Sequence, residues 1–272
     1  MADNRPIGVF DSGIGGLTVL REIWDLLPGE GTVYFGDNGR APYGTKSKST
    51  VIKYSLQNMK FLEEKDVKII VIACNTASAH AYKALAENSK VPVIEVVTPG
   101  AKAAAKATKN GRIGIIATKG SVNSGVYKDA VERFSAPGTK IWQQACPLFV
   151  SLAEEGWWDN DITASVCREY LTPLKEAGVD TLVLGCTHYP LLSNAIQRFM
   201  GNEVTLINAG KAVAEVVKST LDEKGLASDG AEPVRAFFTS DEPELFEDIA
   251  SPFLGRGLPA GTKHFDTDRY SV

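Results

Sequence analysis

The feature that most constrains the fold is an apolar segment ending on a cysteine, because the chain contains it twice. Residues 67–78 read VKIIVIACNTAS and present Cys74 directly after the apolar run. Residues 179–190 read VDTLVLGCTHYP and present Cys186 in the same place, 112 positions later. A short apolar run followed by turn and helix-starting residues is typical of a strand buried in a parallel sheet. The duplication therefore indicates two similar halves, each with one cysteine at the carboxyl end of a strand.

A second pair of matching segments supports the duplication. Residues 5–12 (RPIGVFDS) and 111–118 (GRIGIIAT) match in the same order, at an offset of 106 positions. The expected strands are the two cysteine strands and residues 7–10, 32–35, 91–97, 112–117, 139–144, 204–207 and 236–239. The expected helices include residues 17–27, 47–64, 101–108, 126–134, 161–177, 211–224 and 244–250. This alternation predicts an α/β protein with two pseudo-symmetric three-layer domains and mostly parallel sheets.

Four polar or reactive residues follow the expected strands, namely Asp11, Cys74, Thr118 and Cys186. Ligands of parallel α/β sheets bind at the carboxyl ends of strands. We therefore expect an active site in the cleft between the two domains, with residues 118–124 forming a polar turn.

Composition excludes several classes of function. The chain of 272 residues carries a net charge of −4, which argues against nucleic acid as a partner. No apolar run approaches the roughly 18 residues needed to cross a bilayer, and the N-terminal residues lack a signal-peptide core, so we expect a cytoplasmic protein. Its four cysteines include no Cys-x-x-Cys pair and no zinc-finger spacing. Structural zinc and a thioredoxin-type motif are therefore not expected.

A glycine-rich turn, residues 11–16, follows the first strand. Gly13 and Gly15 fit a dinucleotide fingerprint, and Asp37 lies where a ribose-binding acid is expected, but Thr18 occupies the third glycine position. The alternative is that the glycines let the backbone approach a small anionic substrate at a helix N-terminus. The sequence favours this second interpretation.

Each strand-end cysteine faces a helix start. The positive end of a helix dipole lowers a thiol pKa from the usual value of about 8.5, so both Cys74 and Cys186 are candidates for reactive thiols. The alternative is a small buried apolar residue, a common fate of free cysteine. Packing alone gives no reason to repeat the polar neighbours as well. Cys146 precedes a proline and Cys167 lies within an expected helix, so both are interpreted as structural.

Two equivalent thiols on two related halves can act on opposite faces of one carbon. One thiolate removes a proton while the other thiol delivers one, and the centre inverts. This chemistry needs opposite protonation states, and each sulfur needs a polar group that tunes it. Asp11 is expected beside Cys74, and His188 lies two residues after Cys186.

Four motifs resemble those of the bacterial glutamate racemase family, within the aspartate/glutamate racemase superfamily. They are DSGIGGL at residues 11–17, PYG at 42–44, ACNTAS at 73–78 and GCTHYPLL at 185–192. The resemblance covers essentially the whole chain. It implies a racemase that interconverts L- and D-glutamate for peptidoglycan synthesis, with no cofactor and no metal. It also implies that residues 211–272 pack back onto residues 1–98, leaving 99–210 as the second domain. Members of the family often form dimers, which makes a homodimer the assembly to test, although the sequence itself does not reveal the oligomeric state.

The resemblance also assigns roles. Cys74 acts on D-glutamate and Cys186 on L-glutamate, assisted by Asp11, His188 and the acidic residue Glu154. Substrate contacts carry over to Asp11, Ser12, Pro42, Tyr43, Gly44, Asn75, Thr76, Thr118, Thr187 and His188.

Three other functions stay open from the residues. A racemase of a related substrate such as aspartate would use the same two thiols. A non-catalytic amino-acid-binding module would tolerate loss of both cysteines, and a cysteine hydrolase would need only one of them.

Overall fold

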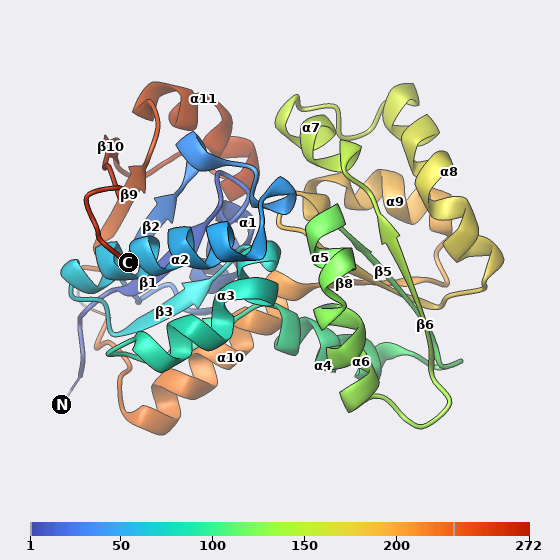
Figure 1. Ribbon diagram of the computed structural model, residues 1–272, viewed down its shortest axis with the longest axis horizontal. Coiled ribbons are helices and arrows are strands. Elements are labelled where there is room, and N and C mark those ends of the chain that lie inside the picture. The colour runs from blue at the N-terminus through green and yellow to red at the C-terminus, as the bar shows by residue number, and fades with distance from the viewer. Residues whose placement is uncertain (1, 231) are drawn as a thin grey trace. The chain divides into compact units, whose positions relative to one another are not determined.

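Two parallel sheets organise the residues that the computed structural model describes, 2–230 and 232–272. The chain divides into two compact units (Figure 1). Unit 1 comprises Met1–Val96 and Gly210–Val272, and unit 2 comprises Val97–Ala209.

The sheet of unit 1 has the strand order β10-β9-β2-β1-β3-β4, and every neighbouring pair is parallel. Its strands are β1 (Ile7–Asp11), β2 (Thr32–Gly36), β3 (Ile69–Ile72), β4 (Val93–Glu95), β9 (Arg235–Thr239) and β10 (Thr262–His264). The central strands β1, β2 and β3 are buried along their whole length. A parallel sheet buried in this way needs helices on both faces.

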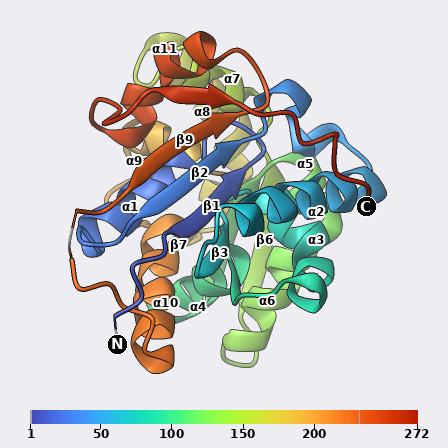
Figure 2. The same cartoon turned by 90° about the vertical axis from the view of Figure 1, so that its left-hand side faces the viewer.

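Helices cover both faces of this sheet. Its α-helices are α1 (Leu17–Leu26), α2 (Lys48–Glu64), α3 (Asn75–Asn88), α10 (Ala209–Lys224), whose first residue belongs to unit 2, and α11 (Pro243–Leu254). Figure 2 shows α2 and α3 on one face, with α1 and α11 on the other. Helix α1 turns Leu17, Leu20 and Trp24 into the core, the spacing of an amphipathic helix. Two 3₁₀ turns, η1 (Asn38–Arg40) and η2 (Tyr43–Thr45), follow β2.

The sheet of unit 2 has the order β6-β5-β7-β8, again with parallel pairs throughout. The strands are β5 (Arg112–Ala117), β6 (Lys140–Ala145), β7 (Thr181–Gly185) and β8 (Thr205–Asn208). The helices are α4 (Val97–Ala107), α5 (Lys119–Ser124), α6 (Val126–Phe134), α7 (Leu148–Glu154), α8 (Asp161–Glu176), α9 (Ser193–Met200) and the 3₁₀ helix η3 (Tyr189–Leu192). Helices α4 and α6 pack together, as do α8 and α9. Both pairs flank the sheet in Figure 1.

The duplication predicted from the sequence is present in the topology. In each unit the first four strands lie in the order second, first, third, fourth, and the cysteine strand is the third. Strand β3 therefore pairs with β1 as β7 pairs with β5. This confirms an α/β fold of two units with parallel sheets.

Two local expectations were wrong, and one strand was missed. The strand expected over residues 91–97 ends at Glu95, because α4 begins at Val97. The polar turn expected over 118–124 is largely helix α5, since the Thr118 hydroxyl caps it and Gly125, at φ +69°, ends it. Strand β10 was not expected, because its three residues carry no alternating apolar pattern.

Candidate active site

The carboxyl ends of neighbouring strands bring the predicted polar residues together within each unit. In unit 1, Phe10 lies opposite Ile72, so Asp11 at the end of β1 and Cys74, two residues after β3, lie at adjacent strand ends. In unit 2, Ala117 lies opposite Gly185, which places Thr118 and Cys186 in the equivalent positions. We call the two groups the Cys74 cluster (Asp11, Ser12 and Cys74) and the Cys186 cluster (Glu154, Cys186, Thr187 and His188).

Cys74 caps the N-terminus of α3. Its sulfur accepts a hydrogen bond from the Ala77 amide at 3.4 Å and lies 3.5 Å from the Ser12 hydroxyl oxygen, to which the thiol donates. Only 5% of the residue is exposed. The sulfur is thus held at the helix start by two polar contacts and is nearly removed from solvent.

The Asp11 carboxylate is fully buried beneath the glycine-rich turn. Its Oδ2 atom accepts the amides of Gly13 at 3.3 Å and Gly16 at 3.0 Å. A Cβ atom at Gly16 would lie 2.5 Å from the Asp11 Cβ, so only glycine allows the turn to close around the acid. Tyr34, which the sequence did not single out, supports the turn by donating its hydroxyl to the Gly13 carbonyl at 2.7 Å. The amides of Gly13 and Gly16 thus bind the Asp11 carboxylate.

The expected lowering of the Cys74 pKa was wrong. Burial, the largest cause, and the charge of the nearby Asp11 carboxylate together raise the pKa of this thiol from 9.0 to about 12, although its hydrogen bonds with Ser12 and Ala77 lower the pKa. Desolvation and a like charge therefore outweigh the helix terminus. At neutral pH the Cys74 cluster holds a protonated thiol, which is a proton donor.

The Cys186 cluster begins where β7 ends. Cys186 is 7% exposed, and its sulfur lies 3.7 Å from His188 Nδ1. Thr187 Oγ1 lies 3.5 Å from the same nitrogen. On the other side of the ring, His188 Nε2 donates to Glu154 Oε1 at 2.9 Å. Glu154 is the last residue of helix α7 and is exposed. The imidazole therefore lies between a surface carboxylate and a buried sulfur.

His188 carries a proton at neutral pH. Burial lowers its pKa, but hydrogen bonds to Cys186 and Glu154 and the charges of both groups raise it from 6.5 to about 10. A carboxylate that orients a histidine against a nucleophilic group is a recurring catalytic arrangement. The sulfur in this cluster therefore faces an imidazolium, whereas Cys74 faces a carboxylate.

The predicted substrate loop, residues 42–44, lies at the start of η2. Tyr43 is 1% exposed, and its hydroxyl donates to Asp37 while accepting the Asn58 amide at 3.1 Å. The tyrosine side chain thus points into the core and anchors the loop from within. Asp37 is also fully buried, so it does not fit the ribose-binding role considered for it.

The remaining predicted residues lie at helix starts. Asn75 and Thr76 form the buried first turn of α3, and Thr118 caps α5 by accepting the Ser121 amide at 3.3 Å. The other two cysteines are buried: the Cys146 thiol donates to the Gln144 carbonyl at 3.7 Å, and Cys167 lies inside α8. Burial raises the pKa of both thiols.

Two features are absent from the described part of the chain. No group of three or more histidine, cysteine or acidic side chains among residues 2–230 and 232–272 could hold a metal ion. Within the same residues, none of the helices combines the length and the apolar character needed to cross a membrane.

The fold and the two clusters define a parallel α/β protein of two related units, each with a buried thiol after its third strand. The model of the Asp/Glu/Hydantoin racemase family matches residues 7–217, and the chain belongs to this family. A glutamate racemase from Geobacter metallireducens is 48% identical over 255 residues, covering 93% of this chain and 94% of the relative.

Solved structures agree in fold. The glutamate racemase from Francisella tularensis, in complex with D-glutamate, superposes with a TM-score of 0.92 at 38% identity and covers 98% of this chain and 100% of that one. A glutamate racemase isoform from Bacillus anthracis gives a TM-score of 0.92 at 39% identity, covering 97% and 98% of the two chains.

Proposed function

We propose that the protein interconverts L- and D-glutamate without a cofactor, using Cys74 and Cys186 as two acid–base groups. The observation that carries the proposal is the duplicated thiol, in which matched cysteines have opposite electrostatic partners. The names of the relatives and the D-glutamate complex of the Francisella protein support glutamate as the substrate.

The reaction needs opposite protonation states at the two sulfurs, and the two clusters surround these sulfurs with groups of opposite charge. Cys186, whose sulfur lies 3.7 Å from Nδ1 of the protonated His188, is the base that takes the α-proton of L-glutamate. Cys74 holds its proton, as its pKa of about 12 implies, and delivers it to the opposite face of the carbon. The product is D-glutamate, and the protonation states of the two sulfurs are then exchanged. In the reverse direction Asp11, whose turn lies next to Cys74, assists the first thiol.

The α-proton of an amino acid is a very weak acid, so the developing carbanion needs electrostatic stabilisation. Removing one preorganised donor from a comparable site lowers turnover about 100- to 1,000-fold. Donors of this kind are the side chains and amides at helix starts: Ser12, Asn75, Thr76, Thr118 and Thr187. Under this proposal they hold the substrate while the two sulfurs approach opposite faces of one α-carbon.

The proposal places the reaction in cell-wall synthesis, because the family that the motifs resemble supplies D-glutamate for peptidoglycan. It also requires both thiols to stay reduced. Cytoplasm meets this requirement, since thiols are kept reduced there.

The test is a chiral assay on metal-free, cofactor-free protein in deuterated water. We expect D-glutamate formed from L-glutamate to carry deuterium at its α-carbon. Single changes Cys74→Ala and Cys186→Ala should each lower turnover roughly 100- to 10,000-fold, the usual range for losing an acid–base group. Cys167→Ala serves as the matched control and should keep its activity.

Each alternative gives a different result. Faster racemisation of aspartate than of glutamate would assign the related substrate. Glutamate binding with no turnover, unchanged in both cysteine variants, would indicate a binding module. A product of altered mass that needs only one cysteine would indicate hydrolysis.

A further inference from the structure

A buried carboxylate lies directly behind the predicted substrate loop. Asp37 follows β2 and is fully buried. Its side chain accepts hydrogen bonds from the Tyr43 hydroxyl, from Arg40 Nε at 2.9 and 3.0 Å, and from the Ser240 hydroxyl at 2.7 Å. Its own amide donates to the Asp11 carbonyl at 3.1 Å. Asp37 therefore links the loop to the strand end that carries the Cys74 cluster.

Arg40 neutralises this acid, and all five of its N–H groups have acceptors. Nε binds Asp37, Nη1 binds Gln57 Oε1 at 2.5 Å and Asp268 Oδ1 at 3.0 Å, and Nη2 binds Asn58 Oδ1 at 3.0 Å and Thr267 Oγ1 at 2.5 Å. The side chain is only 12% exposed. A lysine could not reproduce this planar fork, because its ammonium offers three donors from a single point.

Two of these acceptors come from the far end of the chain. Thr267 lies 227 positions after Arg40 and belongs to the segment 265–272, which we call the strap. The strap is tied to helix α2: Gln57 Nε2 donates to the Tyr270 carbonyl at 3.0 Å, and Lys60 Nζ donates to the Ser271 carbonyl at 2.6 Å.

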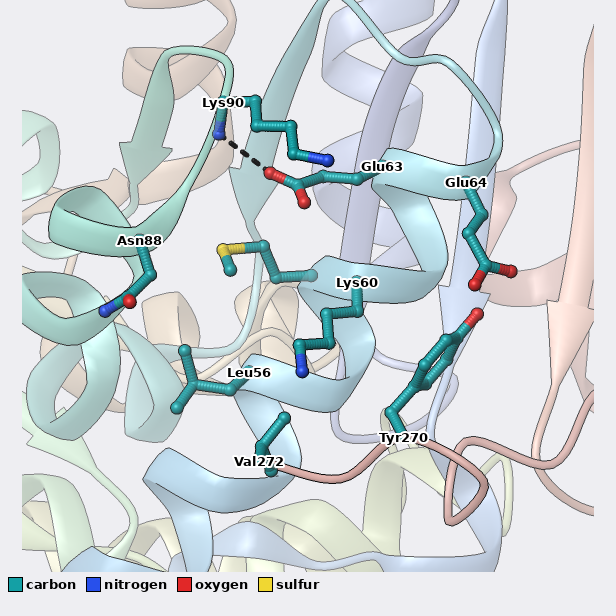
Figure 3. Close-up of a pocket in the computed structure, with 9 residues that line it drawn as sticks. Leu56, Lys60, Glu63, Glu64, Asn88, Lys90, Tyr270 and Val272 are labelled. Atoms are coloured by element: carbon teal, nitrogen blue, oxygen red, sulfur yellow. Dashed lines mark hydrogen bonds between the residues drawn. The ribbon is translucent and has the colours of Figure 1, made fainter.

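Figure 3 shows how the strap runs along α2. Tyr270 lies beside Glu64, and Val272 lies near Leu56. Together with α2 and α3 these residues line a pocket of about 650 Å³. The ring of Phe265, at the start of the strap, packs against Phe61 with 4.3 Å between centroids. The strap is therefore anchored by core contacts as well as by hydrogen bonds.

We propose that Arg40 is a positioning residue for the substrate loop, residues 42–44, and that the strap holds Arg40 in place. The inference rests on the proposed function, since it concerns the same substrate. None of the side-chain hydrogen bonds of Arg40 described above goes to Pro42 or Gly44. It acts through Asp37, whose carboxylate fixes the Tyr43 hydroxyl and so the backbone on either side of it. Substrate affinity thereby depends on residues near position 267.

The test compares three variants in the full chain. Arg40→Lys keeps the charge and loses the fork, and we expect KM for both glutamate enantiomers to rise about 10-fold, with kcat changing less than about 3-fold, because a displaced loop weakens binding. Thr267→Val removes one acceptor at nearly constant volume and should raise KM about 3-fold. Arg256→Lys is the matched control, because Arg256 also pairs with an aspartate, Asp25, and lies over the Trp24 ring.

Calorimetric binding of D-glutamate and thermal melting accompany the kinetics. A structural role alone would lower the melting temperature and leave KM and the dissociation constant unchanged. The inference is overturned if KM in Arg40→Lys and Thr267→Val stays within twofold of the wild type, or if Arg256→Lys raises KM equally. Should Arg40→Lys not fold, Thr267→Val decides alone. Wild-type protein that does not racemise glutamate would refute the proposed function and not this inference. The dissociation constants of D-glutamate in wild type and variants would then still test whether Arg40 positions the loop.

Discussion

The contact between Glu154 and His188 makes a quantitative prediction about pH. Replacing Glu154 with glutamine removes a negative charge whose Oε1 atom lies 2.9 Å from His188 Nε2, while keeping a hydrogen-bond acceptor there. The two full charges would interact by about 1 kcal/mol in water and about 4 kcal/mol near a protein surface at 4 Å. The Glu154 side chain is 44% exposed, so solvent screening places the effect near the lower end.

Losing about 1.4 kcal/mol of attraction between the carboxylate and the imidazolium corresponds to a His188 pKa lowered by about one. The pKa of His188, which is about 10 in the wild type, should then fall towards 9. The imidazolium persists at pH 7.5 in both proteins, so the rate from L- to D-glutamate should be nearly equal there. At pH 9.5 the variant should be roughly threefold slower, because less of its His188 is protonated.

Initial rates of D-glutamate formation between pH 7 and pH 10.5 measure this effect. Glu155→Gln is the control, since it removes an adjacent exposed carboxylate and should leave the profile unchanged. An alkaline limb at the same pH in Glu154→Gln and wild type would refute the electrostatic reasoning. A uniform loss at every pH would instead assign Glu154 a purely steric role.

Three further outcomes follow from the clusters. Iodoacetamide at pH 8 should label Cys186 before Cys74, as read by peptide mass spectrometry, because the pKa of the Cys74 thiol is about 12; equal labelling would contradict this. Gly16→Ala, whose methyl would meet a carbon of the buried Asp11 at 2.5 Å, should lower stability to chemical denaturation by about 1–3 kcal/mol, and unchanged stability would show that the turn adapts. Because the pKa of His188 is raised, its protonation stabilises the fold fully below pH 6.5, and this contribution is lost as pH rises through about 10. Calorimetric melting temperatures should therefore fall over that pH range, and they should fall less in His188→Asn. A melting temperature that rises with pH would contradict this reasoning.

Most of the architecture could be read from local patterns. The strands at residues 7–10 and 112–117 and the helices at 17–27 and 126–134 match the structure to within a residue or so. Their apolar runs and helix-spaced faces are periodic signals that need no knowledge of the partner element. Strand β10 and helix α5 escaped this reasoning, because both are short and neither carries such a period.

The candidate site was also predicted only in part. The sequence singled out both cysteines, because their setting is duplicated, and it named His188 and Asp11 as their polar neighbours. It misjudged the direction of the Cys74 pKa, since burial beside a carboxylate is a property of packing. The role of Arg40 is likewise set by packing, because its guanidinium lies between Asp37 and Thr267, which is 227 positions away along the chain.

The sequence by itself determined the repeat, the parallel α/β class and the two thiols, because these depend on residues that are neighbours along the chain. Only the tertiary structure decided which cysteine faces an acid and which faces an imidazolium, and how residues 265–272 reach Arg40. Burial and contacts between distant residues set those properties, and they exist only once the chain has folded.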